Sequence, residues 1–386
     1  MKSLVKVSLG GDPEVFLKIN GKYVSSDRFL PPKEKPRMVS RGKIYNDGFQ
    51  AEIGLDTGVC KEQFSYNVMY SMRNFVRYLL SLDKINSEIG AIKTIELDTS
   101  PIISVTKSEL AKAGKRACEF GCEPDYSAWD EDEEIAYPDA KSFLKRFAGG
   151  HIHVGYGNSV IYEAFLYKPE NILRCVRAMD IFVGIPSVAF TQNNRELEKE
   201  RRKYYGQAGR YRKQPWGFEY RALSPFWINH TAITSIISDF TRIAVTSVFR
   251  NDAKSYNEIS ELITEDEIRH IINNADVKKA KELTRETIIP FLIKEFGQDR
   301  TNTNFRPLLL TKELIGFIGL TLEKGWDGAI RYLSPASHSK LKLGYNERTY
   351  DLNRFAMSHN GLETYLNAST GVKKTSYKLI EEYNFW

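Results

Sequence analysis

Hydrophobic and polar residues alternate near the start of the chain, as in strands with one buried face. Val5, Val7 and Leu9 alternate with polar residues, and Asn20-Gly21 is a typical hairpin turn between two further strand-like stretches. The polar stretch that follows contains three prolines and predicts a loop over residues 25–43. The predicted strands cover residues 4–20, 22–24, 44–55, 92–97, 151–155 and 217–223.

Apolar residues recur at helical spacing in other parts of the chain, and this pattern dominates after residue 230. We therefore predict an α+β fold, with a strand-rich region over residues 1–230 and a helix-rich region over residues 231–386 packed on the same domain. The predicted helices cover residues 62–89, 169–188, 231–249, 265–274, 277–296, 312–324 and 351–366.

Composition narrows the possible functions only slightly. Hydrophobic residues make up 42% of the 386 residues, which is enough for a sizeable core. The formal net charge of +6 fits a protein that handles anionic substrates such as nucleotides, whereas no long basic block indicates nucleic-acid binding. The chain has no apolar run of about 18 residues and no visible signal peptide, so we expect a cytoplasmic protein without a membrane span.

The four cysteines do not form the pattern of a zinc site. Cys118 and Cys122 are four positions apart, but Cys60 and Cys175 are isolated. Structural zinc sites usually draw on two close pairs. We therefore expect reduced, structural thiols.

Two carboxylate-bearing segments are candidates for a metal site. Asp12 and Glu14 lie two residues apart, so on a strand they share one face, and neighbouring carboxylates repel each other unless a cation neutralises them. Glu52 is bracketed by apolar residues, and Gly54 allows another group to approach the backbone closely. The alternatives are a surface turn for the first segment and a half-buried strand with outward polar residues for the second.

Two histidines and a later Glu–Arg pair extend this set. His151 and His153 have the same two-residue spacing and are flanked by glycines, although the chain has only six histidines. A neutral imidazole binds metals and a protonated one contacts phosphate; the alternative is a pair of hydrogen-bonded core histidines. Glu219 and Arg221 share one face of another predicted strand.

A basic stretch with interleaved tyrosines precedes Glu219. The planar guanidinium group of arginine can bind two oxygens of a phosphate or carboxylate at once. The alternatives are a solvated charged helix and a nucleic-acid patch, which the position before the Glu–Arg strand disfavours. The chain has no phosphate-binding P-loop, so any ATP phosphates must be held by metals and arginines. The basic residues are Arg195, Arg201, Arg202, Lys203, Arg210, Arg212 and Lys213.

Taken in order, these segments resemble the glutamine synthetase superfamily. Its members carry an E-P-E type strand, a segment ending in E-I-G, then G-M-H-x-H and E-x-R. The full pattern is most similar to the phage-type carboxylate–amine ligases, which are amidoligases related to glutamine synthetase and glutamate–cysteine ligase. The resemblance covers roughly residues 8–228. The matching stretches are Gly11–Leu17, Gln50–Gly54, Gly150–His153, Tyr205–Arg212 and Glu219–Arg221.

The resemblance implies a curved, mainly antiparallel sheet with helices on its outer face. It also implies that ATP and two or three Mg²⁺ ions, or Mn²⁺, serve to join a carboxylate to an amine through an acyl phosphate. Glu14 and Glu52 would bind the metal nearer the substrate. Asp12, His151 and Glu219 would bind the metal that bridges the ATP phosphates.

The remaining residues would contact anions. The resemblance places His153 near the phosphates and Arg221 at the transferring phosphoryl group. Arg210 and Arg212 are candidates for phosphate or substrate carboxylate, and Arg202 is a further candidate for ATP binding.

Two departures from the family pattern leave the metal count open. Position 12 is Asp where glutamine synthetase has Glu, so its reach is shorter. The family's additional Glu before E-I-G has no clear match, and Asp47 is the available substitute. A loop at residues 25–43 or 119–139 is a candidate cover for the acyl phosphate.

Two other function classes stay open from the sequence: a phosphotransferase of guanidino-kinase type and a non-catalytic nucleic-acid-binding protein. The expected partners are a small-molecule or peptide carboxylate and an amine. Their identity and the oligomeric state are not predicted.

Overall fold

The structure is a computed structural model of the chain. It describes residues 6–82, 85, 88–90, 94–114, 125–130, 143–296, 312–333 and 342–344. Cys118, Cys122, the predicted helix 351–366 and most of residues 119–139 lie outside the described residues. Cys60 and Cys175 are free thiols, as expected.

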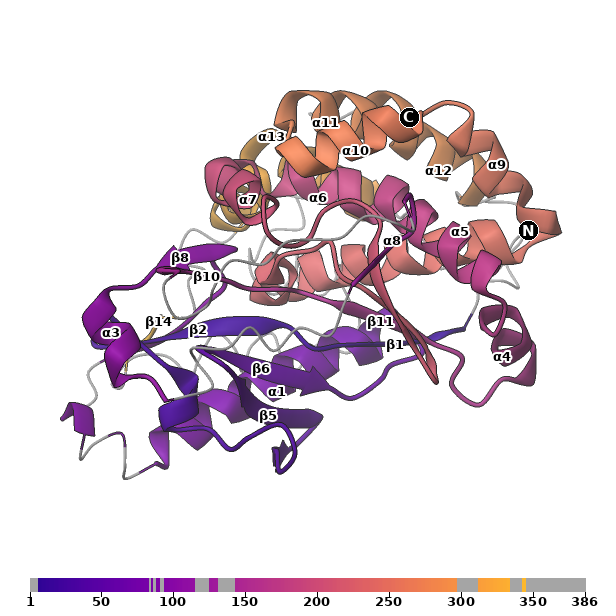
Figure 1. The fold of residues 1–386 in the computed structure, drawn as a ribbon. Helices are drawn as coiled ribbons and strands as arrows, with labels where there is room; N and C mark the ends of the chain where they lie inside the picture. Colours follow the sequence, from indigo (N-terminus) through magenta and orange to yellow (C-terminus); the bar gives the residue numbers. More distant parts are fainter. Residues whose placement is uncertain are drawn as a thin grey trace.

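Two antiparallel sheets form the strand-rich part of the fold, and the chain crosses from one to the other at Asp12-Pro13 (Figure 1). A short ribbon, β8 (Ile102–Ser104) with β10 (Lys145–Phe147), accompanies them. The first sheet has the order β1 (Ser8–Gly11), β11 (Ile152–Gly155), β13 (Gly217–Tyr220), β12 (Arg210–Gln214) and β9 (Tyr126–Ser127). The second has the order β14 (Lys342–Gly344), β7 (Thr94–Asp98), β2 (Glu14–Ile19), β6 (Gln50–Leu55), β5 (Gly42–Asp47) and β4 (Arg37–Val39), with β3 (Lys22–Val24) paired to β2.

The turns explain where the strand predictions were right and where they were wrong. Asn20-Gly21 joins β2 to β3 with positive φ angles of 49° and 79°, which confirms the predicted hairpin. The single strand expected at residues 44–55 is wrong, because a turn with Gly48 at φ 67° splits it into the β5–β6 hairpin. The expected loop 25–43 also contains β4 and the start of β5.

The helical periodicity correctly placed most helices, but two long ones are interrupted. A π-helical turn at Asp180–Gly184 separates α5 from α6, and another at Thr284–Ile288 separates α11 from α12. The described helices are α1 (Lys61–Leu80), α3 (Lys107–Lys112), α4 (Val160–Leu166), α5 (Pro169–Met179), α6 (Ile185–Phe190), α7 (Arg195–Arg201), α8 (Thr231–Phe249), α9 (Lys254–Ser260), α10 (Glu265–Asn274), α11 (Val277–Leu283), α12 (Ile289–Phe296) and α13 (Lys312–Leu333).

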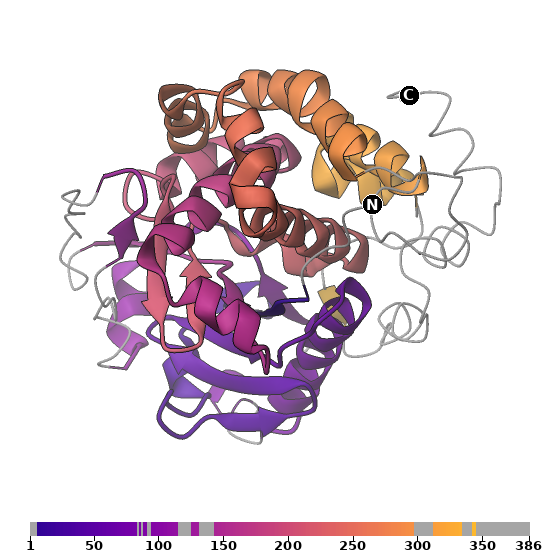
Figure 2. The same cartoon turned by 90° about the vertical axis from the view of Figure 1, so that its right-hand side faces the viewer.

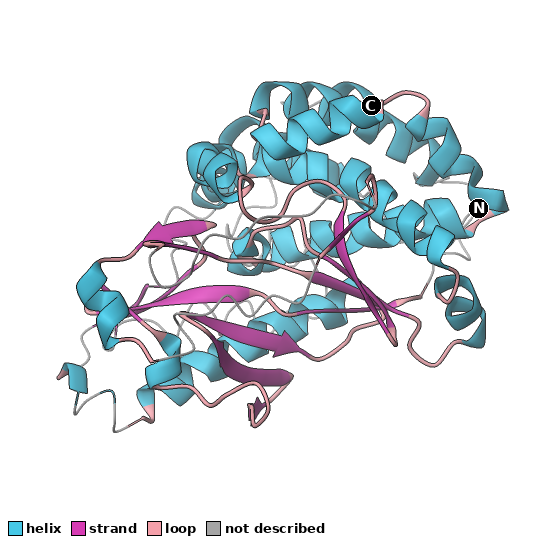
Figure 3. Cartoon of the chain, in the orientation of Figure 1, coloured by secondary structure: helices cyan, strands magenta, loops and turns pink. Residues whose placement is uncertain are grey.

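One hydrophobic core joins the two predicted regions. It extends from Val7 to Ile330, and α8 packs against both α1 and α5. The later helices form a layer on one side of the strands (Figures 2 and 3). Helix α8 is long and apolar enough to cross a membrane, but 94% of its apolar window is buried inside the protein, as in a core helix. The boundary at residue 230 stays a prediction, although β14 shows that the later region also adds a strand to the second sheet.

Helix α8 also fixes the first strand of the site. The buried guanidinium group of Arg242 donates hydrogen bonds to the carbonyl oxygens of Val7 and Gly58, at 2.6 and 2.9 Å. Gly58 pairs in turn with Leu9 of β1. The helical layer therefore sets the position of the strand that leads into Asp12.

Candidate active site

The register of the first sheet gathers polar side chains beside the crossing point. Gly10 of β1 lies opposite His153 of β11, His153 lies opposite Glu219 of β13, and Glu219 lies opposite Arg212 of β12. Directly opposed residues project from the same face of a sheet. Strand β11 and the β12–β13 hairpin thus supply one row of side chains, and Asp12 follows β1 at its end.

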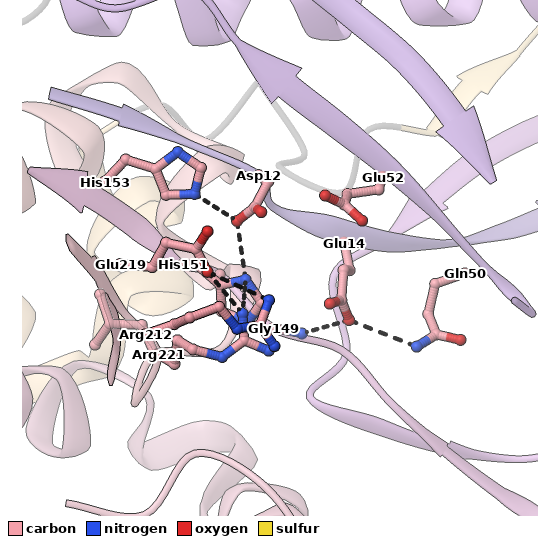
Figure 4. Close-up of polar contacts among 12 residues, drawn as sticks. Asp12, Glu14, Gln50, Glu52, Gly149, His151, His153, Arg212, Glu219 and Arg221 are labelled. Atoms are coloured by element: carbon pink, nitrogen blue, oxygen red, sulfur yellow. Dashed lines mark hydrogen bonds and ion pairs between the residues drawn. The ribbon is translucent and has the colours of Figure 1, made fainter. Parts of the chain in front are cut away.

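Asp12 is the centre of this cluster. Its Oδ1 atom lies 2.8 Å from Nδ1 of His151 and 3.1 Å from Nε2 of His153 (Figure 4). Burial raises the pKa of the Asp12 carboxyl, but the rings of His153 and His151 outweigh this effect, so its pKa lies well below the ordinary value. The carboxylate is therefore kept charged inside the protein.

Asp12, His153 and Glu219 have ligand atoms that all lie within 4.8 Å of one another. Two carboxylates and an imidazole are suitable ligands for Mn²⁺, and the carboxylate oxygens are also suitable ligands for Mg²⁺. The chemistry of this donor set therefore fits a divalent ion. The expected set had His151 in place of His153.

His151 has protein partners at both ring nitrogens. Besides Asp12, its Nδ1 atom lies 3.3 Å from Nη1 of Arg221, and its Nε2 atom is hydrogen-bonded to the hydroxyl of Tyr205. Burial and the charge of Arg221 lower the pKa of His151, which favours the neutral ring. A side chain at Gly149 would overlap this ring, so the glycine is required there. In this arrangement His151 orients Asp12.

The second sheet contributes a pair of opposed glutamates. Glu14 of β2 lies directly opposite Glu52 of β6, and both are buried. The amide of Gly149 donates to Oε2 of Glu14 at 2.8 Å, and the hydroxyl of Tyr45 donates to Glu52. Burial first, and the nearby Asp47 carboxylate second, raise the pKa of Glu14 to about 8.

Glu52 experiences the same environment. Burial raises its pKa well above the ordinary value, and the carboxylates of Asp12 and Asp47 add to this effect. Like charges opposed across a sheet destabilise it, so positive charge between the two sheets would stabilise the fold. The Glu14–Glu52 pair therefore also fits the expectation of bound cations.

Two arginines border the cluster and alternate with carboxylates. Nε of Arg221 lies 2.7 Å from Asp125, and Nη1 lies 3.0 Å from Glu219. Arg212 lies 3.4 Å from Asp125 and 3.7 Å from Glu219. The remaining Arg221 nitrogen, Nη2, donates to the hydroxyl of Tyr205. All three nitrogens of Arg221 thus have protein partners, whereas the Arg212 side chain is 15% exposed.

The basic stretch is largely internal. Arg201, Arg202 and Arg210 are buried, so the solvated-helix interpretation is wrong for them. Arg202 forms an ion pair with buried Glu198 at 3.2 Å, and the structure does not bring it to the Asp12 cluster. Arg210 begins β12, where its carbonyl oxygen accepts a hydrogen bond from the amide of Arg221.

Sequence reasoning missed Asp125, Tyr45 and Lys33 and did not single out Tyr205. Asp125 lies in the stretch 119–139, which was considered only as a loop that could cover the site, yet its side chain is 1% exposed. Tyr45 was hidden because residues 44–55 were taken as one strand, whereas the hairpin pairs it with Glu52. Strand register reveals only Tyr45, whereas Asp125, Lys33 and Tyr205 lie outside the strands.

A protein-family comparison adds independent support for the resemblance. A model of the family described as "Phage phiEco32-like COOH.NH2 ligase-type 2" matches residues 131–265, about a third of the chain. The matched stretch contains His151, His153, Glu219 and Arg221. No curated protein and no solved structure matches the chain significantly. The family match confirms the resemblance to the phage-type carboxylate–amine ligases that the motifs indicated.

Proposed function

We propose that this protein is an ATP-dependent carboxylate–amine ligase that uses divalent metal ions and forms an acyl phosphate. The main support is the cluster of Asp12, His153 and Glu219 beside Arg212 and Arg221, within a chain whose matched family is described as a COOH.NH2 ligase. The antiparallel sheets and the motif order support a place in the glutamine synthetase superfamily as part of this proposal. We further propose that it acts in the cytoplasm, of a host cell if it is phage-encoded.

The proposed reaction has two steps. A carboxylate oxygen attacks the γ-phosphorus of ATP, which breaks the bond to the β-phosphate oxygen and gives an acyl phosphate and ADP. The amine nitrogen then attacks the acyl carbon, loses a proton, and releases phosphate as the amide bond forms. We assign the binding of phosphoryl oxygens to Arg212 and Arg221, the cationic side chains beside Glu219, because a positioned cationic group stabilises the charge that develops there.

The metal sites would be held by named residues of the chain. Asp12, His153 and Glu219 would hold one ion, and the pair Glu14 and Glu52 would contribute to a second. Bound ions would neutralise phosphate charge and hold the reacting groups in line.

One alternative loses support from the burial of the basic stretch. A nucleic-acid binder needs cationic side chains that reach phosphates at the surface. Arg201, Arg202 and Arg210 are instead 0–3% exposed. The phosphotransferase alternative is separated from ligation by its products.

The decisive experiment is a screen of carboxylate and amine mixtures for magnesium-dependent ADP release, with mass spectrometry of the products. A ligase gives ADP together with a condensation product, whereas a phosphotransferase gives ADP and a phosphorylated product without the amide. Glu219→Gln should abolish ADP release, and Glu163→Gln on the exposed face of α4 should not. Failure of the purified protein to bind ATP at millimolar magnesium would refute the proposal.

A further inference from the structure

A lysine stands over the glutamate half of the site. The Nζ atom of Lys33 lies 3.8 Å from Oε1 of Glu52 and 5.6 Å from the centre of the Tyr45 ring. We propose that Lys33 is the resident counter-cation of the Glu14–Glu52 pair. A first divalent ion then binds without displacing it, and a second ion binds weakly because Lys33 opposes it. This inference rests on the metal-binding part of the proposed function.

The loop that carries Lys33 is fastened to the sheet. The side-chain amide of Asn46 donates to the carbonyl oxygens of Leu30 and Pro31, at 2.9 and 2.8 Å. The Asn46 backbone amide donates to Pro31 as well, and Pro32 forms a bridge with Asn46. Prolines have a fixed φ angle, which further restricts the loop. The loop therefore directs the Lys33 ammonium group toward the site.

The acidic groups around the Glu14–Glu52 pair favour a cation next to it. Glu14 and Glu52 oppose each other across two strands, and Asp47 also acts on both carboxyls. Among the charged neighbours of Lys33, the Glu52 carboxylate has the strongest electrostatic attraction to its ammonium group, followed by Asp12 and Asp47. When these carboxyls are ionised, one ammonium group therefore offsets part of the repulsion between them.

The two halves of the site also differ in how completely their ligands are gathered. Asp12, His153 and Glu219 place three ligand atoms within 4.8 Å, and no other described group of three His, Cys, Asp or Glu residues does so. The Glu14–Glu52 half lacks such a third ligand and has the Lys33 ammonium beside it. A divalent ion that binds there is coordinated by two carboxylates but is repelled by the positive charge of Lys33. We therefore expect unequal affinities for the two ions.

The test counts bound Mn²⁺ from the electron paramagnetic resonance signal of the free ion, without nucleotide, at fixed pH and ionic strength. In the wild type we expect one tighter and one weaker equivalent. Lys33→Ala should bind the second equivalent at least about tenfold more tightly, the effect of about 1.4 kcal/mol from removing one partly screened charge. Lys33→Arg should behave as the wild type, because it keeps the charge.

Lys35→Ala is the matched control, because Lys35 lies exposed in the same loop and its loss changes the net charge equally. The Lys33 side chain is 56% exposed, so its replacement leaves the core intact. An unchanged second affinity in Lys33→Ala, or an equal gain in Lys35→Ala, would overturn the role of Lys33 alone. Absence of Mn²⁺ binding by every variant, or a first equivalent that survives Glu219→Gln, would overturn both this inference and the metal-binding part of the proposed function.

Discussion

Replacing Glu14 with glutamine should stabilise the metal-free protein at alkaline pH while it weakens metal binding. The glutamine keeps an oxygen that can accept the hydrogen bond from the Gly149 amide, so the shape of the site is preserved. It removes one of the two opposed charges of the Glu14–Glu52 pair. The substitution therefore measures the destabilisation caused by the buried negative charge without changing the packing of the site.

The expected magnitude follows from the pKa of Glu14. Burial, followed by the charge of Asp47, raises this pKa from 4.5 to about 8, so the folded protein holds the proton more tightly than the unfolded chain. The free energy of unfolding therefore falls as pH rises from about 4.5 to about 8 and then levels off. At about 1.4 kcal/mol per pKa unit, the loss reaches at most about 5 kcal/mol. Neighbouring carboxyls titrate together with Glu14, so its own share is smaller.

Urea unfolding followed by tryptophan fluorescence in EDTA, at several values between pH 5 and pH 9, measures this effect. The wild type and the exposed control Glu163→Gln should lose stability together over this range. Glu14→Gln should lose less and be the most stable of the three at pH 9. Magnesium at pH 8 should restore more stability to the wild type than to Glu14→Gln, because ligand binding to the folded state stabilises it. Parallel pH profiles for the wild type and Glu14→Gln would refute the reasoning.

Three further substitutions test the surroundings of the site. Gly149→Ala should displace the His151 ring and lower ADP formation by about 100-fold, with an unchanged circular dichroism spectrum. Asp125→Asn removes one of the two carboxylates that pair with Arg221 and should cost about 2 kcal/mol in the free energy of unfolding by urea. Burial raises the pKa of Asp180 to about 7, so the wild type loses stability as this carboxyl ionises. The melting temperature of Asp180→Asn, relative to that of the wild type, should therefore be higher at pH 8.5 than at pH 5.5.

Local patterns in the sequence were enough to place most elements of the fold. Helical periodicity located α8 and α10 at their observed bounds, and Asn20-Gly21 located a hairpin. The single strand expected at residues 44–55 was wrong because Asp47-Gly48, a hairpin signal, was not taken as a turn. The π-helical turn at Asp180–Gly184 was missed because one inserted residue barely changes the apolar periodicity.

The site was predictable wherever its residues are neighbours in sequence. The spacing of Asp12 with Glu14, and of His151 with His153, already indicated shared faces. Partners that meet through strand register, such as Tyr45 with Glu52, left no comparable signal. Sequence could therefore name the reactive groups, but not which of them touch.

The basic stretch shows why residue type alone did not settle its role. Arg201 donates hydrogen bonds to the carbonyl oxygens of Ala148, Ala222 and Leu223, at 2.7, 3.1 and 2.8 Å. It thereby joins the segment before His151 to the segment after Arg221. A side chain at Gly206, which has φ 77°, would overlap the Arg201 guanidinium group. Arg201 and Gly206 thus help to fix the backbone segments that carry the reactive side chains.

Arg201 also contributes to the charge balance of the site. Its buried guanidinium group interacts favourably with the Glu14 carboxylate, although burial comes first and lowers the pKa of Arg201 to about 10. Together with Lys33 above Glu52 and Arg221 beside Glu219, it offsets part of the negative charge before any metal binds. Because these protein cations already offset part of the negative charge, a metal ion bound as proposed would have to compete with them for the same carboxylates.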